Sequence, residues 1–213
     1  MEAEELRLFA QIYGMFGSLF GEPPRPADGV PAPASEGEEA QGNLSETMAG
    51  VMAALRQVRQ DPAAAAAPAA DYERLFVGPD HLPAPPWESV YRTEEHLLCG
   101  APCLEVRAAY RAAGLEVTGG HAVPDDHISF ELAFMSVLCS RAAEALERGE
   151  DPEPWLSQRS AFLREHLLTW APAFAADVQR HAATDYYRAL ALWLSSWLDL
   201  EASLLGETVE GRA

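Results

Sequence analysis

Apolar residues recur at three- and four-residue spacing through most of this chain, and no segment shows the sustained apolar–polar alternation that a half-buried strand requires. A stretch with the helical spacing can bury one face against a shared core. Such stretches cover residues 2–20, 43–60, 103–113, 124–148, 153–170 or beyond, 172–181 and 185–205. The sequence therefore predicts an all-α fold.

Prolines and glycines divide this helical pattern. Residues 22–42 contain five prolines, several glycines and acidic side chains, a composition typical of a long surface loop. A length of 213 residues suits one large domain or two small ones, and we expect a single-domain helical bundle over residues 1–213. The shorter segments predict a connector or short helix at 63–70, one or two helical turns at 71–77, a proline-containing loop at 78–90 and a short helix at 94–99.

A glycine pair precedes one of the longest predicted helices. Gly119 and Gly120 leave the backbone free, which makes residues 119–123 a candidate hinge. Pro124 has a φ angle suited to the first position of a helix, so the sequence predicts a helix that begins there.

Polar side chains gather at the start of this predicted helix. Asp125 and Asp126 fall in its first turn, where negative charge meets the positive end of the helix dipole. His127 and Glu131 are four residues apart and therefore share a helical face. Residues of these types also serve as ordinary helix caps, so residue types alone do not decide between a structural and a functional role.

The chain is strongly acidic. Its 33 acidic residues exceed its 15 basic residues and give a net charge of −18. Every basic residue is arginine, which excludes a P-loop lysine, a Schiff-base lysine and a Ser-Lys dyad. The acid surplus argues against nucleic acid and anionic membrane, because phosphate contacts need clustered basic side chains. A cationic partner fits this charge best.

The cysteines and the first residues indicate the compartment. Cys99, Cys103 and Cys139 form an odd number without Cys-x-x-Cys spacing, which predicts a reducing environment. Cys103 and Cys139 are expected in the core as small apolar side chains. The first residues lack the positive region of a signal peptide, and no apolar run reaches about 18 residues. We therefore expect a cytoplasmic protein with no membrane insertion.

Two kinds of catalytic site compete with a binding site. A metal-dependent helical hydrolase could use His121, His127 and the nearby carboxylates, although the zincin pattern His-Glu-x-x-His is absent. Nucleophilic catalysis lacks a Gly-x-Ser-x-Gly elbow, and Ser129 points away from His127 on a helix. The glycine pair without lysine is a poor phosphate site. We expect no catalytic residue, no metal and no cofactor, with the hydrolase as an alternative.

Aromatic and acidic residues instead favour peptide binding. Aromatic rings can anchor an apolar segment and stack on guanidinium groups, and carboxylates bind arginine in fork geometry. Capture of a helical or apolar segment in a groove is the matching mode. The candidate anchors are Leu75, Phe76, Trp87 and Tyr91, and the candidate carboxylates are those of Glu88, Asp125, Asp126 and Glu131.

Four blocks carry a family resemblance. They are Asp71-Tyr72-Glu73-Arg74-Leu75-Phe76-Val77-Gly78, Pro83-Ala84-Pro85-Pro86-Trp87-Glu88-Ser89-Val90-Tyr91, Glu105-Val106-Arg107-Ala108-Ala109-Tyr110, and Pro124-Asp125-Asp126-His127 with Glu131-Leu132-Ala133-Phe134-Met135. In type and order they resemble the TorD/DmsD family of redox enzyme maturation chaperones. The resemblance is close over residues 71–140 and extends to the flanking helices by type and length.

The resemblance implies an all-helical, cytoplasmic chaperone of the TorD-like type that is not an enzyme. Members of the family bind the twin-arginine signal peptide of a molybdenum-cofactor oxidoreductase subunit, hold it back from export and assist cofactor insertion. By position, the family's Glu-Pro-x-Asp-His motif places Pro124, Asp126 and His127 in the signal-peptide site. The upstream block adds Leu75, Trp87 and Tyr91 to that site.

One position departs from the family motif. Val123 stands where the motif has Glu, which removes one carboxylate, and Asp125 is the candidate replacement. Some members of the family exchange domains as dimers, and the Gly119-Gly120 joint is a candidate hinge for a homodimer of that kind.

The resulting hypothesis is a chaperone whose partners are a twin-arginine signal peptide and the catalytic subunit of a molybdoenzyme. In it, Asp126 and its acidic neighbours neutralise the arginines of the client, and His127 orients the pocket. Aromatic residues take the apolar segment. The alternatives are the metal-dependent hydrolase and a general helical interaction module for another client.

Overall fold

The computed structural model describes residues 1–25, 43–79, 81–94, 98–118 and 123–210. Within these residues the regular elements are helices, and the prediction of an all-α fold is confirmed. The described part of the chain contains no strand, only an isolated antiparallel bridge between Trp87 and His127. None of its helices is both long and apolar enough to span a membrane. The chain divides into two compact units, each formed by two separate stretches of sequence.

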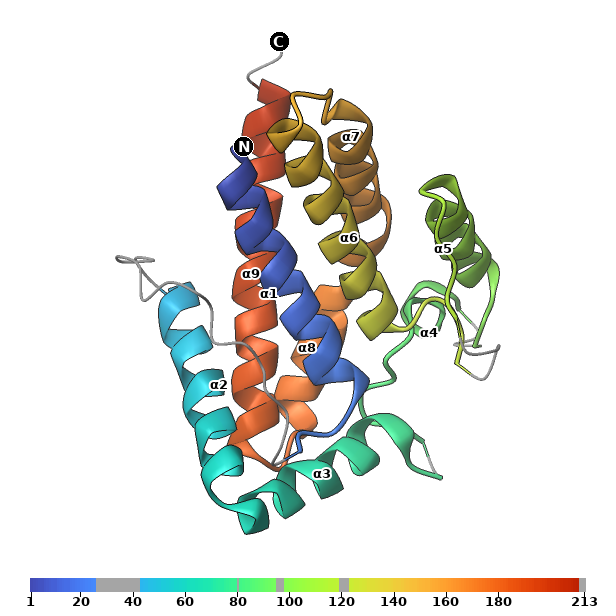
Figure 1. The fold of residues 1–213 in the computed structure, drawn as a ribbon. Coiled ribbons are helices and arrows are strands. Elements are labelled where there is room, and N and C mark those ends of the chain that lie inside the picture. The colour runs from blue at the N-terminus through green and yellow to red at the C-terminus, as the bar shows by residue number, and fades with distance from the viewer. Residues whose placement is uncertain (26–42, 80, 95–97, 119–122, 211–213) are drawn as a thin grey trace. The chain divides into compact units, whose positions relative to one another are not determined.

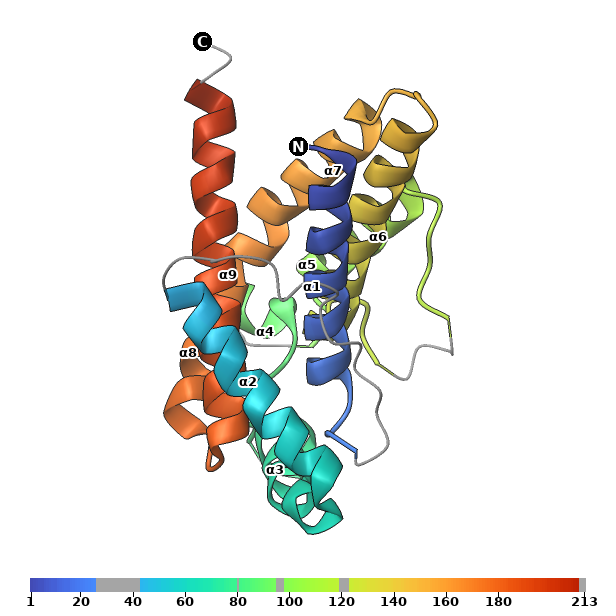
Figure 2. The same cartoon turned by 60° about the vertical axis from the view of Figure 1, so that its left-hand side comes forward.

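The first unit comprises residues 1–21 and 86–171. Its helix α1 lies along α6, and α6 also packs against α7 (Figures 1 and 2). Aromatic side chains of α1, among them Phe9, Tyr13 and Phe16, are buried because they recur at helical spacing on one face. The helical elements are α1 (Ala3–Gly21), α4 (Glu88–Arg92), α5 (Ala101–Ala112), α6 (Ile128–Glu147), α7 (Glu153–Phe162), a π-helical turn (Leu163–Leu167) and the start of α8 (Leu168–His181).

The second unit comprises residues 22–85 and 172–213. Its helix α2 packs against α9. Trp193 and Trp197, which are four residues apart on α9, are buried. The chain passes from one unit to the other after Gly21, after Pro85 and after Ala171, and the last of these points lies inside α8. The elements of this unit are α2 (Asn43–Gln60), a 3₁₀ turn (Pro62–Ala65), α3 (Ala66–Tyr72), a π-helical turn (Glu73–Val77), the rest of α8 and α9 (Asp185–Glu210).

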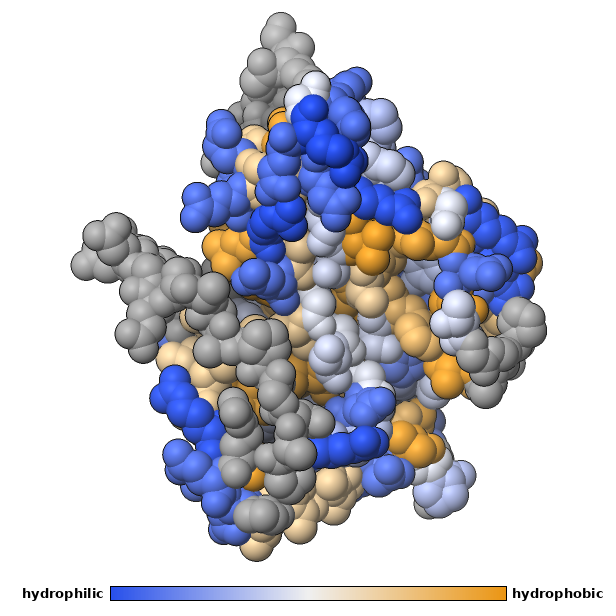
Figure 3. Space-filling view, viewed as in Figure 1, coloured by the Kyte–Doolittle hydropathy of each residue, from blue (hydrophilic) through white to orange (hydrophobic). Residues whose placement is uncertain are grey.

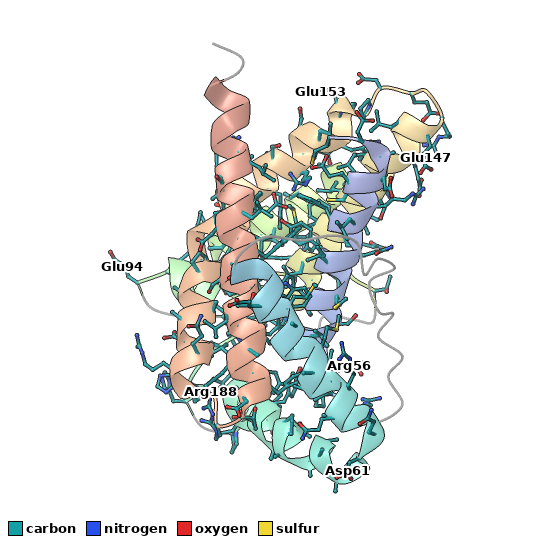
Figure 4. The ribbon with its side chains drawn as sticks, turned by 90° about the vertical axis from the view of Figure 1, so that its left-hand side faces the viewer. Arg56, Asp61, Glu94, Glu147, Glu153 and Arg188 are labelled. Atoms are coloured by element: carbon teal, nitrogen blue, oxygen red, sulfur yellow. The ribbon has the colours of Figure 1, made fainter. Side chains whose placement is uncertain are left out.

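Hydrophilic side chains gather over the end of the first unit where α1 begins and α6 gives way to α7 (Figure 3). Glu147 and Glu153 point outward there (Figure 4). Glu147 pairs with Arg7 at 2.6 Å, with both side chains almost half exposed. Part of the acid surplus is therefore a solvated face, and exposed ion pairs of this kind contribute little stability.

The helix predicted to begin at Pro124 begins at Ile128 instead, so that prediction is wrong. His127 has an extended backbone (φ −74°, ψ 137°) and is the N-cap of α6. The ring nitrogen Nδ1 of this histidine accepts a hydrogen bond from the N–H of Ser129 at 3.2 Å. The pairing of His127 with Trp87 keeps the preceding residues out of the helix, and local sequence patterns do not show such a long-range pair.

Helix α4 is a second difference between the structure and the prediction. It includes residues 88–90, which were predicted as part of a loop. The carboxylate of Asp126 accepts a hydrogen bond from the N–H of Ser89 at 2.8 Å and so caps this short helix from 37 residues away. The helix predicted at 94–99 is not supported, since residues 94, 98 and 99 form turns, while residues 95–97 lie outside the described residues.

Three predictions about organisation stay predictions. Most of the proposed surface loop, residues 26–42, lies outside the described residues, and so do residues 119–122 of the candidate hinge. The single-domain organisation also stays a prediction. By contrast, residues 63–70, for which the sequence left a connector or a short helix open, are helical, and the helical turns predicted at 71–77 are confirmed.

Candidate functional site

The candidate site is organised by two backbone hydrogen bonds in the first unit. The N–H of Ile128 donates to the carbonyl of Pro86 at 2.9 Å, and the N–H of Glu88 donates to the carbonyl of Asp126 at 3.0 Å. These bonds join the start of α4 to the segment that leads into α6. Predicted residues at 87–91 and 124–131 are thereby brought together, although more than thirty residues separate them.

Asp126 lies at the centre of this junction and is fully buried. Its Oδ2 accepts the hydrogen bond from the N–H of Ser89, which stabilises the positive end of α4. Its Oδ1 has no hydrogen-bond partner among the described residues. A buried acceptor without a partner typically costs about 1–3 kcal/mol, so this oxygen is able to accept a further hydrogen bond.

His127 is buried and neutral at pH 7. Burial lowers its pKa to about 4. Its Nδ1 accepts from the N–H of Ser129 and lies 2.7 Å from the hydroxyl oxygen of the same serine, so the expectation that these two side chains point apart is wrong. Its ring meets Trp87 edge-on and also contacts Phe130, with a centroid separation of 5.7 Å in each case. This histidine therefore positions the neighbouring rings and caps α6.

Asp125 connects the same segment to α5. Its carboxylate forms an ion pair with Arg107, and its backbone carbonyl accepts a hydrogen bond from the hydroxyl of Tyr110 at 3.1 Å. Asp125 is buried, whereas Pro124 before it is partly exposed. The charge of Asp125 is therefore already matched by an internal arginine.

Glu88 and Glu131 are both fully buried beneath the junction. Glu88 forms an ion pair with Arg92, and its two carboxylate oxygens lie 3.1 and 3.0 Å from Nδ1 of His166. Oε2 of Glu131 accepts a hydrogen bond from the indole N–H of Trp170 at 3.0 Å. Burial, followed by the nearby charge of Glu88, raises the pKa of Glu131 well above its usual value.

The parts of the site that reach solvent are mainly aromatic. Trp87 and Tyr91 are partly exposed, and the ring of Tyr91 lies 5.5 Å from that of Trp170. The indole Nε1 of Trp87 is buried and has no partner among the described residues. Glu94, just after α4, is exposed and points outward (Figure 4).

Leu75 and Phe76 belong to the second unit. Both are buried in its π-helical turn, and Phe76 meets Tyr187 edge-on at a centroid distance of 5.4 Å. Asp71, from the same sequence block, accepts hydrogen bonds from the N–H groups of Ala183 and Thr184 at 3.0 and 2.8 Å. This block therefore builds the core of the second unit.

Several residues around the two buried acids were not predicted. Arg92 is four residues after Glu88, a spacing that does allow a helical ion pair to be anticipated. His166 and Trp170 come from a distant helical segment that gave only a core pattern. Their polar partners depend on how α4, α6 and the following helices pack, so no local signal identifies them.

A metal site receives no support from the part of the chain that the structure describes. In these residues, no group of three or more histidine, cysteine or acidic side chains could hold a metal ion. His121, the second histidine of the hydrolase alternative, lies outside the described residues. The described geometry instead brings partly exposed aromatic rings and buried acceptors together where the start of α4 meets the segment before α6.

The comparisons with known proteins agree on one family. The profile of the family described as nitrate reductase delta subunit matches residues 37–176. The chaperone protein TorD of Vibrio cholerae serotype O1 (strain O395) is 30% identical over 168 residues, which are 79% of this chain and 76% of that protein. A Haemophilus influenzae protein described as a probable Tat proofreading chaperone DmsD is 33% identical over 121 residues, 57% of this chain and 53% of that protein.

A solved structure from Archaeoglobus fulgidus, described as that of a "putative redox enzyme maturation protein", is 22% identical and covers 93% of this chain and 94% of that chain. Its TM-score of 0.46 is too low to carry an argument about the fold, which rests on the helices themselves. The fold and the named relatives define an all-helical chaperone and not an enzyme. The chain belongs to the TorD/DmsD family of redox enzyme maturation chaperones.

Proposed function

We propose that this chain is a cytoplasmic chaperone that binds the twin-arginine signal peptide of a molybdoenzyme catalytic subunit and assists cofactor insertion before export. Membership of the TorD/DmsD family supports a role in molybdoenzyme maturation. The observation that carries the proposal is the junction of α4 and α6. It combines partly exposed rings with an unpartnered carboxylate oxygen of Asp126 and an unpartnered indole N–H of Trp87.

These two unpartnered groups suit a peptide that carries arginine beside apolar residues. A guanidinium N–H can donate to Oδ1 of Asp126, and a peptide carbonyl can accept from Trp87. Because Asp126 is fully buried, the guanidinium reaches it only when neighbouring side chains move aside. Exposed Glu94 adds attraction at the surface, and Trp87 and Tyr91 contact the apolar segment.

The remaining predicted residues have supporting roles in this proposal. His127 fixes the ring of Trp87, while Pro124 and Asp125 shape the segment before α6. Leu75 and Phe76 contribute through the packing of the second unit. Domain exchange into a homodimer through residues 119–123 remains part of the proposal.

Calorimetric titration with a twin-arginine leader peptide tests the function. We expect micromolar or tighter binding, and a loss of about tenfold or more, some 1.4 kcal/mol, when both peptide arginines become glutamine. Asp126→Asn should cause a similar loss, because the amide oxygen still caps Ser89 while the charge disappears.

Asp199→Asn is the matched control, since it removes the same charge from an exposed position on α9. It should leave the affinity within about twofold, a difference of less than 0.5 kcal/mol by the same conversion, which is about the size of effect expected for an exposed charge. Failure of several such leader peptides to bind the unmodified chain would remove the proposed function while leaving the fold and family intact.

A further inference from the structure

The carboxylate of Glu88 is held by two side chains to which peptide recognition gives no role. It is 0% exposed, forms an ion pair with Arg92 on the same helix, and lies with its two oxygens 3.1 and 3.0 Å from Nδ1 of His166. A carboxylate has only acceptor atoms, so Nδ1 of His166 carries a hydrogen and donates it. Removing one partner of a buried charge is strongly destabilising, because the charge is left without compensation.

The two partners of Glu88 differ in their exposure to water. The side chain of Arg92 is 29% exposed and also lies 3.5 Å from the exposed carboxylate of Glu105 on α5. The side chain of His166 is only 8% exposed, so its hydrogen bond forms where the local dielectric is low. Hydrogen bonds to a charged acceptor are also roughly twice as strong as those between neutral groups. His166 therefore contributes the better protected of the two contacts.

His166 lies in a π-helical turn, Leu163–Leu167, within the helical run that leads from α7 into α8. In this turn the N–H of Leu168 donates to the carbonyl of Leu163, five residues earlier. The ring of His166 stacks on Phe162 with a centroid separation of 4.6 Å and an interplanar angle of 26°. Single π-helical turns are rare and are frequent at functional sites. The turn and the stack together fix the direction in which His166 points.

His166 and Trp170 attach α4 at two points. His166 contacts Glu88, the first residue of α4, and the ring of Trp170 lies 5.5 Å from that of Tyr91, near the end of the helix. Helix α4 has only five residues, and a helix this short does not persist without tertiary contacts. Trp87 immediately precedes Glu88, so both candidate anchor rings depend on this attachment.

We propose that His166 is a positioning residue for peptide binding. Together with the ion pair to Arg92, its hydrogen bond keeps Glu88 buried and so fixes the orientation of α4. The rings of Trp87 and Tyr91 are held in place with this helix. When the donor is lost, Glu88 turns toward water and the short helix moves with it. The peptide-binding part of this inference rests on the proposed function, whereas the placement of α4 does not.

Nitrogen NMR of the full chain at pH 7 tests the hydrogen bond directly. The Nδ1 atom of His166 should carry a hydrogen, and its signal is assigned by its absence from the spectrum of His166→Asn. A ring whose Nδ1 carries no hydrogen would overturn the inference, because that nitrogen and the carboxylate would then both be acceptors.

Two substitutions at His166 separate hydrogen bonding from packing. His166→Asn offers an amide N–H in place of Nδ1 but loses the ring that stacks on Phe162. His166→Phe keeps an aromatic ring against Phe162 and has no donor for Glu88. If His166 only fills space, phenylalanine should be tolerated better than asparagine. A positioning role through the hydrogen bond requires the opposite order.

Hydrogen exchange of the α4 amides measures this order without any peptide. Exchange in residues 88–92 should accelerate by about tenfold or more in His166→Phe and stay within about threefold of the unmodified rate in His166→Asn. Amides of α1 are the internal reference. Equal acceleration in α1 and α4 would indicate general unfolding, and faster exchange in His166→Asn than in His166→Phe would indicate a packing role. Either result, or unchanged exchange in both variants, would overturn the inference.

Titration with the leader peptide completes the test. We expect His166→Phe to lose about tenfold or more in affinity and His166→Asn to lose less than about threefold. If the unmodified chain binds no leader peptide, the proposed function fails, but the NMR and exchange measurements still decide whether His166 places α4. If the peptide binds His166→Phe as tightly as the unmodified chain, the peptide-binding part of the inference is wrong.

Discussion

His127 caps α6 with a neutral ring, because Nδ1 must keep a lone pair to accept from Ser129. Its pKa is about 4 in the folded chain against about 6.5 unfolded, so the unfolded chain binds the proton first as the pH falls. The contribution of this residue to the free energy of unfolding is fully present above about pH 6.5 and is lost as the pH falls toward 4. Its upper limit is about 3 kcal/mol.

Urea unfolding between pH 7 and pH 4 measures this effect against His127→Asn. Asparagine offers a cap acceptor for the N–H of Ser129 but does not titrate, so the variant should lose less stability over this range than the unmodified chain. Buried carboxylates contribute acid sensitivity to both proteins, and the comparison removes that common part. Parallel pH profiles would show that His127 is not the titrating group.

For single residues, the sequence predicted which ones lie near one another at the candidate site. It predicted less well which contacts each of them makes. Aromatic and acidic residue types and the family resemblance led to Trp87, Tyr91, Asp126 and His127, and all four lie at the junction of α4 and α6. Their burial was not predictable, because it depends on partners from distant segments. The sequence placed Asp126 in the first turn of the helix predicted to begin at Pro124, yet its carboxylate caps α4.

At the scale of whole elements, periodicity predicted the long helices well and their starts poorly. Helix α1 is predicted to within a residue or two at each end, since its apolar face is continuous. Helix α6 begins four residues later than Pro124 suggested, because the preceding residues pair with the segment before α4. Local propensity therefore decides an element's existence, and tertiary hydrogen bonds decide where it begins.

The contact between α1 and α6 depends on a small residue. A Cβ atom at Gly17 would lie 3.0 Å from the backbone carbonyl oxygen of Ser129 and 3.4 Å from the backbone nitrogen of Ala133. Alanine gains about 1 kcal/mol in helix propensity over glycine, but overpacking against backbone costs about 1–3 kcal/mol. We expect Gly17→Ala to lower the free energy of unfolding by about 1 kcal/mol, measured by urea denaturation.

Gly206→Ala is the matched control for this prediction. It places the same methyl group on α9, where a Cβ atom meets nothing within 4 Å. Only the propensity gain remains at that position, so stability should rise by up to about 1 kcal/mol. A stabilised Gly17→Ala variant would mean that α1 can shift away from α6 at little cost.

At the scale of the whole molecule, the net charge of −18 governs encounters with a cationic peptide. The acids of the candidate site are buried, so exposed acids such as Glu94, Glu147 and Glu153 create most of the field in solvent (Figure 4). Such a field steers a peptide with two arginines and accelerates association more than it slows dissociation. Association with the leader peptide should therefore slow by tenfold or more between about 0.01 M and 1 M salt, as the Debye length falls from about 30 Å to about 3 Å.

Stopped-flow measurements with sodium chloride separate this field from the contacts at the site. The dissociation rate should change by less than about threefold, because apolar contacts at Trp87 and Tyr91 are insensitive to screening on this scale. The peptide with both arginines changed to glutamine should show almost no salt dependence of association. Equal salt dependence for the two peptides would mean that the arginines do not sense the acidic surface, and recognition would then rest on the apolar segment alone.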